Sequence, residues 1–442
     1  MELEHLRQKV DEGAVDTVLL AMTDLQGRLQ GKRLHAQHFL DDVLDHGAEA
    51  CNYLLAVDVE MNTVEGYALA SWEGGYGDFV LKPDLATLRD VPWQEGTVLL
   101  LADVLREDAT PVRPSPRQVL RSQLDRLAER GWVAQAATEL EFIVFEDTYE
   151  QAWDRGYVGM TPANRYNVDY SLLGTARVEP LLRAIRNHMQ GAGLRVEDAK
   201  GECNFGQHEI NFRYADALTA ADQHVIYKNG AKEIAAQLGM SVTFMAKYDQ
   251  REGSSCHVHL SLAGDDGTAL FSEQPELFDA FLAGQLASLS ELTLLLAPNV
   301  NSYKRFASAS FAPTTIAWGH DNRTCALRVV GHGPGKRIEC RVAGADVNPY
   351  LALSALIAAG LRGIDEGLAL EPPLEGNAYV ADREQVPRSL ADARERFAAS
   401  ALARSALGDD VVDHYVNAAD VELAAFGAAV TDWERVRGFE RL

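Results

Sequence analysis

The first quarter of the chain contains short apolar, β-prone runs separated by polar and glycine-rich stretches, which is the pattern of short β-strands. The segments 15–21 and 96–101 show it most clearly, and glycines gather between them at 74–77. A cluster of three prolines then precedes residue 117. Because prolines interrupt helices and strands, we predict two domains, residues 1–112 and residues 113–442.

Beyond the prolines, apolar residues recur at helical spacing. The first predicted helix begins after Ser115, its expected N-cap, continues through Leu127 and stops at Gly131. Two longer helices are predicted over 275–297 and 348–367, each opened by a proline in its first turn. Strand-like runs separate these helices, so the second domain mixes both kinds of element.

Two of these strands carry ionisable side chains among apolar ones. In the segment 136–145, Glu139 and Glu141 share one strand face, and His257 and His259 have the same two-residue spacing further on. Two carboxylates buried side by side need a compensating cation, and imidazole is a common metal ligand. Each pair alone also fits a solvated strand face or an ion pair.

A third strand places Arg337, Glu339 and Arg341 on one face, which alone could be a salt-bridged ladder.

The net charge of the chain excludes one class of partner. The formal net charge of −24 over 442 residues repels a phosphate backbone and excludes nucleic acid as a partner, whereas cationic partners stay possible.

The spacing of the cysteines and the length of the apolar runs indicate in which compartment the protein is expected. Five scattered cysteines show no disulfide or zinc-finger spacing, and the N-terminus has no signal-peptide pattern. The longest apolar run is taken to be 350–361, which is too short to span a bilayer. We therefore expect a cytoplasmic enzyme with no membrane partner.

Read in order, these segments and several others resemble the glutamine synthetase family over nearly the whole chain. The resemblance implies an α+β fold: an N-terminal β-grasp domain, then a catalytic domain with an antiparallel active-site sheet and surrounding helices. It also implies a homo-oligomer of two stacked rings, a dodecamer, with each active site at a subunit boundary. The segments that carry the resemblance are 82–84, 139–141, 201–209, 257–259, 301–305, 322–328, 337–341 and 348–351.

The resemblance further implies an ATP-dependent ligase that phosphorylates the γ-carboxylate of glutamate before an amine attacks it. Phosphoryl transfer needs divalent cations and arginines. Oxygen ligands favour Mg²⁺, and a histidine among them admits Mn²⁺, with two or more ions in each active site. The implied metal ligands are Glu139, Glu141, Glu202, Glu209, His257 and Glu339.

The other implied contacts fall into catalytic, glutamate-binding and nucleotide-binding groups. Arg323 is the implied catalytic residue at the transferred phosphoryl group. Glu202, or an acidic residue between Glu65 and Asp78, is the candidate for receiving or orienting the amine proton. The implied glutamate-binding residues are Glu141, Gly253, His257, Arg305 and Arg341. The implied ATP-binding residues are Glu197, Tyr214, His259, Ser261, Arg323, Arg328 and Arg337, although ordinary packing also explains Tyr214 and His259.

Two departures from the family pattern concern the amine. The Asp-Gly-Ser-Ser segment that holds ammonium in glutamine synthetases is missing between Val57 and Asp78, and Phe311 replaces a glutamate before Ala-Pro. Losing both carboxylates and gaining apolar surface favours an alkylamine. The chain most resembles the γ-glutamylpolyamine synthetase branch, which uses putrescine, cadaverine, spermidine or spermine. The candidate amine-binding residues are Glu65, Trp72, Glu73, Asp78, Tyr166 and Phe311.

Three alternatives to a polyamine ligase stay open. They are an ordinary glutamine synthetase that uses ammonia, a γ-glutamyl ligase for a monoamine such as ethanolamine, and a non-catalytic nucleotide sensor. The sensor is disfavoured because all six metal-ligand positions carry competent side chains. Tyr379 falls near a tyrosine that some bacterial relatives adenylylate, but its surroundings match poorly, so we interpret it as a structural residue.

Overall fold

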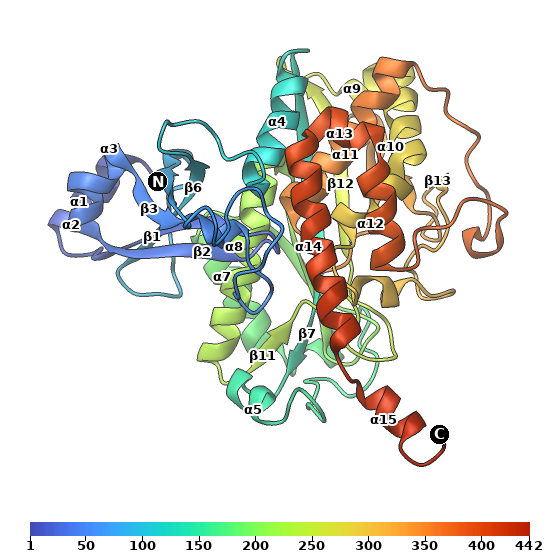
Figure 1. Cartoon of the computed structure of the whole chain (residues 1–442), viewed down its shortest axis with the longest axis horizontal. Helices are drawn as coiled ribbons and strands as arrows, with labels where there is room; N and C mark the ends of the chain where they lie inside the picture. The colour runs from blue at the N-terminus through green and yellow to red at the C-terminus, as the bar shows by residue number, and fades with distance from the viewer.

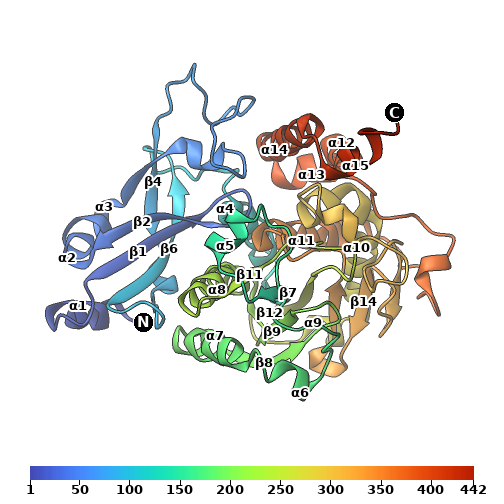
Figure 2. The same ribbon diagram turned by 90° about the horizontal axis from the view of Figure 1, so that it is seen from below.

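The computed structural model describes all 442 residues and contains two β-sheets with helices around them (Figure 1). The smaller sheet lies at the N-terminal end of the molecule, and the larger sheet and most of the helices make up the rest (Figure 2). The α+β class predicted from the sequence is confirmed.

The smaller sheet has six strands in the order β2-β1-β6-β4-β3, with β5 beside β6. The β1–β6 pair is parallel and its other pairs are antiparallel. The predicted strands at 15–21 and 96–101 correspond to β1 and β6. The elements of this part are α1 (Leu3–Asp11), β1 (Thr17–Thr23), β2 (Leu29–His35), α2 (Ala36–His38), α3 (Leu44–His46), β3 (Ala48–Cys51), β4 (Asp78–Pro83), β5 (Arg89–Asp90) and β6 (Thr97–Leu105).

The larger sheet has nine strands in the order β13-β14-β15-β12-β7-β9-β8, with β10 and β11 also pairing with β7. All of its pairs except β13–β14 are antiparallel, as predicted. Its strands are β7 (Trp132–Phe145), β8 (Val196–Gly201), β9 (Gln207–Phe212), β10 (Ala215–Asp216), β11 (Ser241–Thr243), β12 (Cys256–Gly264), β13 (Trp318–His320), β14 (Leu327–Val330) and β15 (Arg337–Cys340).

The helices of this larger part begin and end close to their sequence signals. In α11, the Asn348 side chain accepts a hydrogen bond from the Tyr350 N–H, and Gly367 ends the helix in a left-handed conformation. The helices are α4 (Pro116–Ala128), α5 (Tyr149–Asp154), α6 (Leu172–Thr175), α7 (Glu179–Gly191), α8 (Ala217–Gln237), α9 (Leu270–Glu273), α10 (Pro275–Leu296), α11 (Pro349–Glu366), α12 (Leu390–Ala399), α13 (Ala401–Leu407), α14 (Asp409–Ala428) and α15 (Asp432–Gly438).

Two sequence expectations about helices need correction. Ser115 occupies the N-cap position of α4, but its side chain accepts no capping hydrogen bond. The run 350–361 is also not the most membrane-like segment, because α10 is long and apolar enough to cross a bilayer by length and composition. Within its most apolar window 67% is buried in the fold, and α10 packs against α11 and α12.

Strand β6 contributes to both cores of the molecule. Leu99 and Leu101 belong to the core of the larger sheet, whereas Val98 and Leu100 belong to the core of the smaller sheet. Successive residues of a strand face opposite sides, so one strand serves two cores and holds the smaller sheet against the rest. The domain division at residue 112 stays a prediction.

Candidate active site

Strand register brings the predicted ionisable residues together from distant parts of the chain. Glu139 of β7 lies opposite His257 of β12, and His259 lies opposite Glu339 of β15. On the other side of β7, Glu141 lies opposite Glu209 of β9. Because directly opposed residues of antiparallel strands project to the same face, one face of the sheet collects all of these side chains.

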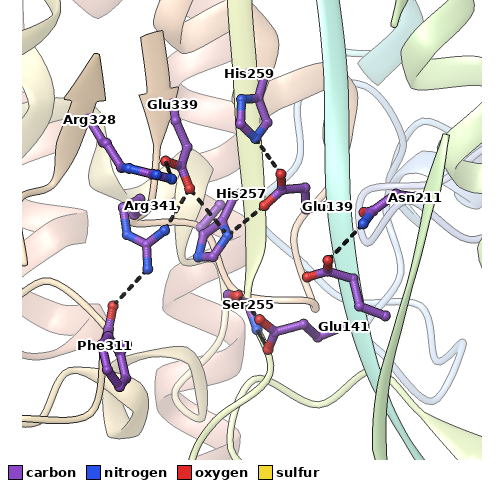
Figure 3. A network of polar contacts seen from close by, with 12 residues as sticks. Glu139, Glu141, Asn211, Ser255, His257, His259, Phe311, Arg328, Glu339 and Arg341 are labelled. Carbon is purple, nitrogen blue, oxygen red and sulfur yellow. Dashed lines mark hydrogen bonds and ion pairs between the residues drawn. The ribbon is translucent and has the colours of Figure 1, made fainter. Parts of the chain in front are cut away.

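Glu139, His257 and Glu339 form the first cluster, which Figure 3 shows across β7, β12 and β15. His257 Nδ1 lies 3.0 Å from Glu139 Oε2 and 3.4 Å from Glu339 Oε1. His259 Nε2 lies 2.9 Å from the second oxygen of Glu139, and its Nδ1 accepts a 3.1 Å hydrogen bond from Arg337. The imidazole and the two carboxylates predicted for this cluster therefore lie close enough together to hold one ion.

Two arginines surround the buried carboxylate of the first cluster. Arg328 donates to Glu339 at 2.8 Å, and Arg341 donates to the other oxygen at 2.6 Å. Burial by itself would raise the pKa of Glu339, but His257 and Arg341 outweigh burial and lower that pKa to about 2. Hydrogen bonds from His257 and His259 likewise outweigh burial at Glu139 and hold its pKa far below the ordinary value. Both carboxylates are thus anionic at neutral pH.

Glu141, Glu202 and Glu209 form the second cluster, whose carboxylate oxygens lie within 4.8 Å of one another. Burial, followed by repulsion from Glu141, raises the pKa of Glu209 to about 8. Lys200 contacts Glu202 and lies 3.7 Å from Glu209. One ammonium group therefore compensates only part of the negative charge gathered here.

The backbone and neighbouring polar groups orient Glu141. The Ser255 N–H donates to Glu141 Oε2 at 2.8 Å, the Ser255 hydroxyl donates to Oε1 at 2.5 Å, and Gln207 Nε2 donates to Oε2 at 2.9 Å. A carboxylate held on both oxygens has little rotational freedom, which is a requirement for a precise ligand or binding site.

Both clusters fit a divalent cation. The second offers only carboxylates, the hard oxygen ligands that Mg²⁺ prefers, and the first adds an imidazole that Mn²⁺ also accepts. The raised pKa of Glu209 reports a site with excess negative charge, which a dication would relieve. The metal-ligand assignments made from the sequence therefore stay proposals with favourable geometry.

A cavity of about 560 Å³ contains both clusters. The predicted catalytic, phosphate-binding and glutamate-binding residues also line it. Those lining residues are Glu139, Glu141, Glu202, Glu209, Gly253, His257, Arg305, Phe311, Arg323, Arg328, Glu339 and Arg341.

A second cavity of about 770 Å³ adjoins the first, and Glu139, Asp198 and Asn211 line both. The five predicted nucleotide residues that the first cavity lacks all line this one: Glu197, Tyr214, His259, Ser261 and Arg337. The predicted nucleotide residues thus fall into two groups that line adjoining cavities, and Glu139 lines both cavities.

Arg305 and Arg341 are both buried beside the first cavity, as a carboxylate clamp requires. Arg305 donates to the backbone carbonyls of Arg341, Val342 and Ala343, and Arg341 donates to Glu339. The Nε atom of each arginine is buried without a hydrogen-bond partner. An unpaired buried donor is costly, so a bound anion that used it would be favoured.

The structure does not bring most of the predicted amine-binding residues to the cavity. Phe311 lines it, whereas Glu65, Trp72, Glu73, Asp78 and Tyr166 do not. The connection between β3 and β4 carries Glu65, Trp72 and Glu73, and Asp78 begins β4. This connection packs elsewhere, since the Glu65 carbonyl accepts a 3.0 Å hydrogen bond from Asn417 of α14. These five residues lie outside the cavity of their own chain, and their role in amine binding stays a prediction.

Sequence reasoning missed other cavity residues. Lys200 precedes Glu202 by two positions, a spacing that could have indicated the shared face. Asp169, Tyr170 and Leu172 line the same cavity. They lie in a connection without periodicity, so the sequence carried no signal for them.

The Tyr379 hydroxyl donates to the Ala312 carbonyl at 3.1 Å, in keeping with the structural role expected from the sequence.

Comparison with known proteins gives the family. A family model described as glutamine synthetase, catalytic domain, matches residues 113–437. The chain belongs to the glutamine synthetase family. A gamma-glutamylethanolamide synthetase of Streptomyces coelicolor is 62% identical over 100% of this chain and 96% of that protein.

Two other members of the glutamine synthetase family are less similar. A gamma-glutamylputrescine synthetase of Escherichia coli is 32% identical over 93% of this chain and 89% of that protein. A solved GmaS complex with ADP superimposes with a TM-score of 0.86 at 28% identity, covering 98% of this chain and 99% of that one. The predicted fold and family are confirmed.

Glu209 leads to a pH-dependent effect of metal on stability. Its native pKa of about 8 exceeds the ordinary value of 4.5, so its stabilising contribution is complete below the ordinary value and is lost as the pH rises to about 8. Metal binding requires the carboxylate. We expect added Mg²⁺ or Mn²⁺ to raise the Tm more at pH 8 than at pH 6 in a thermal-shift assay. Glu209→Gln should remove this difference, and equal Tm shifts for the unaltered protein at both pH values would contradict the assignment.

Proposed function

We propose that this protein is an ATP-dependent ligase that joins the γ-carboxylate of glutamate to a small primary amine, with ethanolamine as the leading substrate. One observation carries the proposal: a single cavity holds two three-residue clusters suited to dications and is lined by four arginines. This arrangement suits transfer of a phosphoryl group from ATP to a carboxylate. The arginines are Arg305, Arg323, Arg328 and Arg341.

Each part of the cavity has a proposed role in that reaction. Arg305 and Arg341 bind the α-carboxylate of glutamate and point its γ-carboxylate toward the two clusters. Arg323 is exposed and makes no ion pair within the chain, so it is free to stabilise the charge on the transferred phosphoryl group. Arg328 holds Glu339, and it contributes positive charge on the nucleotide side.

The clusters supply the remaining charge compensation. Glu141, Glu202 and Glu209 would hold one Mg²⁺ or Mn²⁺, and Glu139, His257 and Glu339 would hold a second. Such ions neutralise phosphate oxygens during phosphoryl transfer. The amine nitrogen then attacks the γ-carbonyl carbon of γ-glutamyl phosphate, forming the C–N bond as the C–O bond to phosphate breaks. Glu202 is the proposed residue for orienting or receiving the amine proton.

Ethanolamine is preferred over a polyamine for two reasons. The 62% identical relative is named for ethanolamide synthesis, whereas the putrescine relative is only 32% identical. The acidic residues that were to receive the far ammonium of a polyamine lie outside the cavity. A monoamine needs no second anionic site, because it carries one charge. A polyamine ligase is the second candidate, supported by the putrescine relative and by the two missing ammonium-site carboxylates.

A substrate panel tests this order. With ATP, glutamate and Mg²⁺ present, phosphate release should be greatest with ethanolamine, lower with putrescine, cadaverine, spermidine and spermine, and lowest with ammonium. We expect the kcat/KM for ethanolamine to exceed that for ammonium by about 100-fold, in line with discrimination by a site built for one ligand. Mass spectrometry should identify the γ-glutamyl amide product.

Each other outcome of the panel selects another function. A faster reaction with a polyamine would replace ethanolamine by the polyamine. A faster reaction with ammonium would make the protein an ordinary glutamine synthetase. ATP binding without phosphate release for any amine would favour a nucleotide sensor.

We also propose that the protein acts as a homo-oligomer of two stacked rings. The connection carrying Glu65, Trp72 and Glu73 does not reach the cavity of its own chain. Trp72 on that connection is 69% exposed, as a residue at a contact between subunits could be in an isolated chain. A subunit boundary at the active site would give this connection a role in a neighbouring cavity.

A further inference from the structure

One wall of the first cavity comes from the segment 164–175, which leads from β7 toward α7. Asp169, Tyr170, Ser171, Leu172 and Thr175 of this segment line the cavity. Figure 2 shows α6, at the end of the segment, beside β8. The segment belongs to the same chain as both carboxylate clusters.

Asp169 lies next to the reacting centre. Its carboxylate is within 4.8 Å of the ligand atoms of Glu202 and Cys203. Glu202 also belongs to the second cluster, which faces the γ-carboxylate of glutamate in the proposed reaction. The Cys203 thiol lies 3.7 Å from Asp169 Oδ2 as a weak donor. A group bound to Asp169 would thus lie beside Glu202, the residue proposed to orient or receive the amine proton.

The aromatic ring of Tyr170, next to Asp169 in the chain, already contacts an ammonium group. Lys200 Nζ lies 4.9 Å from the centroid of the Tyr170 ring while it contacts Glu202. The face of an aromatic ring attracts cations, and a carboxylate beside it adds to that attraction. This corner of the cavity therefore has the chemistry that holds an alkylammonium ion.

Buried contacts hold the segment in place. Asn164 Nδ2 donates to the Gly174 carbonyl at 2.8 Å, and the Asn164 carbonyl oxygen lies 3.0 Å from His208 Nε2 of β9. Asn164 and His208 are both buried. Gly201 of β8 also approaches closely, because a Cβ there would lie only 2.3 Å from the Val168 carbonyl oxygen. Strands β8 and β9, which flank Glu202, thus also hold the segment that carries Asp169.

We propose that Asp169 binds the ammonium group of the amine substrate and that Tyr170 contacts its carbon chain, so that this segment determines amine specificity. The proposal rests on the proposed ligase function. In this proposal, the segment 164–175 takes the place of the residues between Glu65 and Asp78 as the amine site within one chain. The Asp169 carboxylate would compensate the charge of a primary ammonium in a sequence that lacks the family's ammonium-binding aspartate.

Steady-state kinetics of Asp169→Asn test the proposal. We expect kcat/KM for ethanolamine to fall about 10-fold, since a charge-assisted hydrogen bond to the ammonium is lost, while KM for glutamate and for ATP changes less than two-fold. Asp169→Glu keeps the charge and should lose less. The matched control is Asp154→Asn, an exposed residue at the end of α5 that lines neither cavity.

A second variant tests the positioning role of Asn164. Asn164→Ala removes the link between His208 and Gly174, so KM for ethanolamine should rise while KM for ATP stays constant. A merely structural residue would change thermal stability and every kinetic constant together. Unchanged ethanolamine kinetics in Asp169→Asn, with an unaltered protein that does use ethanolamine, would overturn the specificity proposal alone. No amine-stimulated phosphate release from the unaltered protein would instead overturn the ligase function on which it rests.

Discussion

Replacing Glu141 by alanine is expected to lower metal-dependent turnover by on the order of 10³-fold, as the loss of one strong electrostatic contact to a reacting centre typically does. Glu141 is 7% exposed and lies opposite Glu209 across β7 and β9. Its carboxylate cannot be replaced by a neighbour, because Glu202 and Glu209 are already assigned to the same ion. Phosphate release at saturating ATP, glutamate and ethanolamine measures the effect.

The fold must be checked in the same experiment. Alanine at 141 leaves the Ser255 N–H and the Ser255 hydroxyl without their acceptor, which costs about 1–3 kcal/mol of stability for each buried group. Glu141→Gln keeps acceptor atoms and should retain more stability while losing similar activity. Glu395→Ala, on the exposed side of α12, is the matched control. Near-normal metal-dependent turnover in a folded Glu141→Ala protein would refute the metal assignment.

The second large effect is expected at Arg341, which together with Arg305 is proposed to bind the α-carboxylate of glutamate. Arg341→Lys should raise KM for glutamate about 30- to 100-fold, equivalent to about 2–3 kcal/mol, because an ammonium cannot grip a carboxylate with two parallel hydrogen bonds. Arg341 is nearly fully buried, and its Nε has no partner within the chain. Lysine would also weaken the 2.6 Å contact with Glu339.

The pattern of KM values separates this role from others. Initial rates with glutamate, ATP and ethanolamine varied in turn should show the change in KM for glutamate. Arg394→Lys, a surface residue paired with Asp420, is the control. A rise in KM for the amine without a rise in KM for glutamate would show that Arg341 serves the amine instead.

Much of the site was predictable because its side chains lie on strands. Two-residue spacing placed Glu139 with Glu141, and His257 with His259, on common faces before any fold was known. Strand spacing also put Arg337, Glu339 and Arg341 together. The family resemblance then gave each residue a role, and the cavities gather these residues in two adjacent groups.

The amine side was not predictable in the same way. The candidates between Glu65 and Asp78 were chosen for charge and for their place in the family pattern. Their connection packs against α14 through Asn417 and leaves the cavity to Asp169 and Tyr170. Loop conformation depends on contacts with distant residues, and charge alone does not reveal them.

The sequence alone determined the bounds of three helices and the strand faces that carry the ionisable residues, and its family resemblance implied the α+β class. The helix bounds and strand faces follow from local periodicity and from prolines and glycines at element ends. Only the tertiary structure decided that Glu139 faces His257, 118 positions away, and that Lys200 and Asp169 share the cavity with Glu202. Strand register and loop packing are set by contacts between distant segments, which no local pattern in the chain encodes.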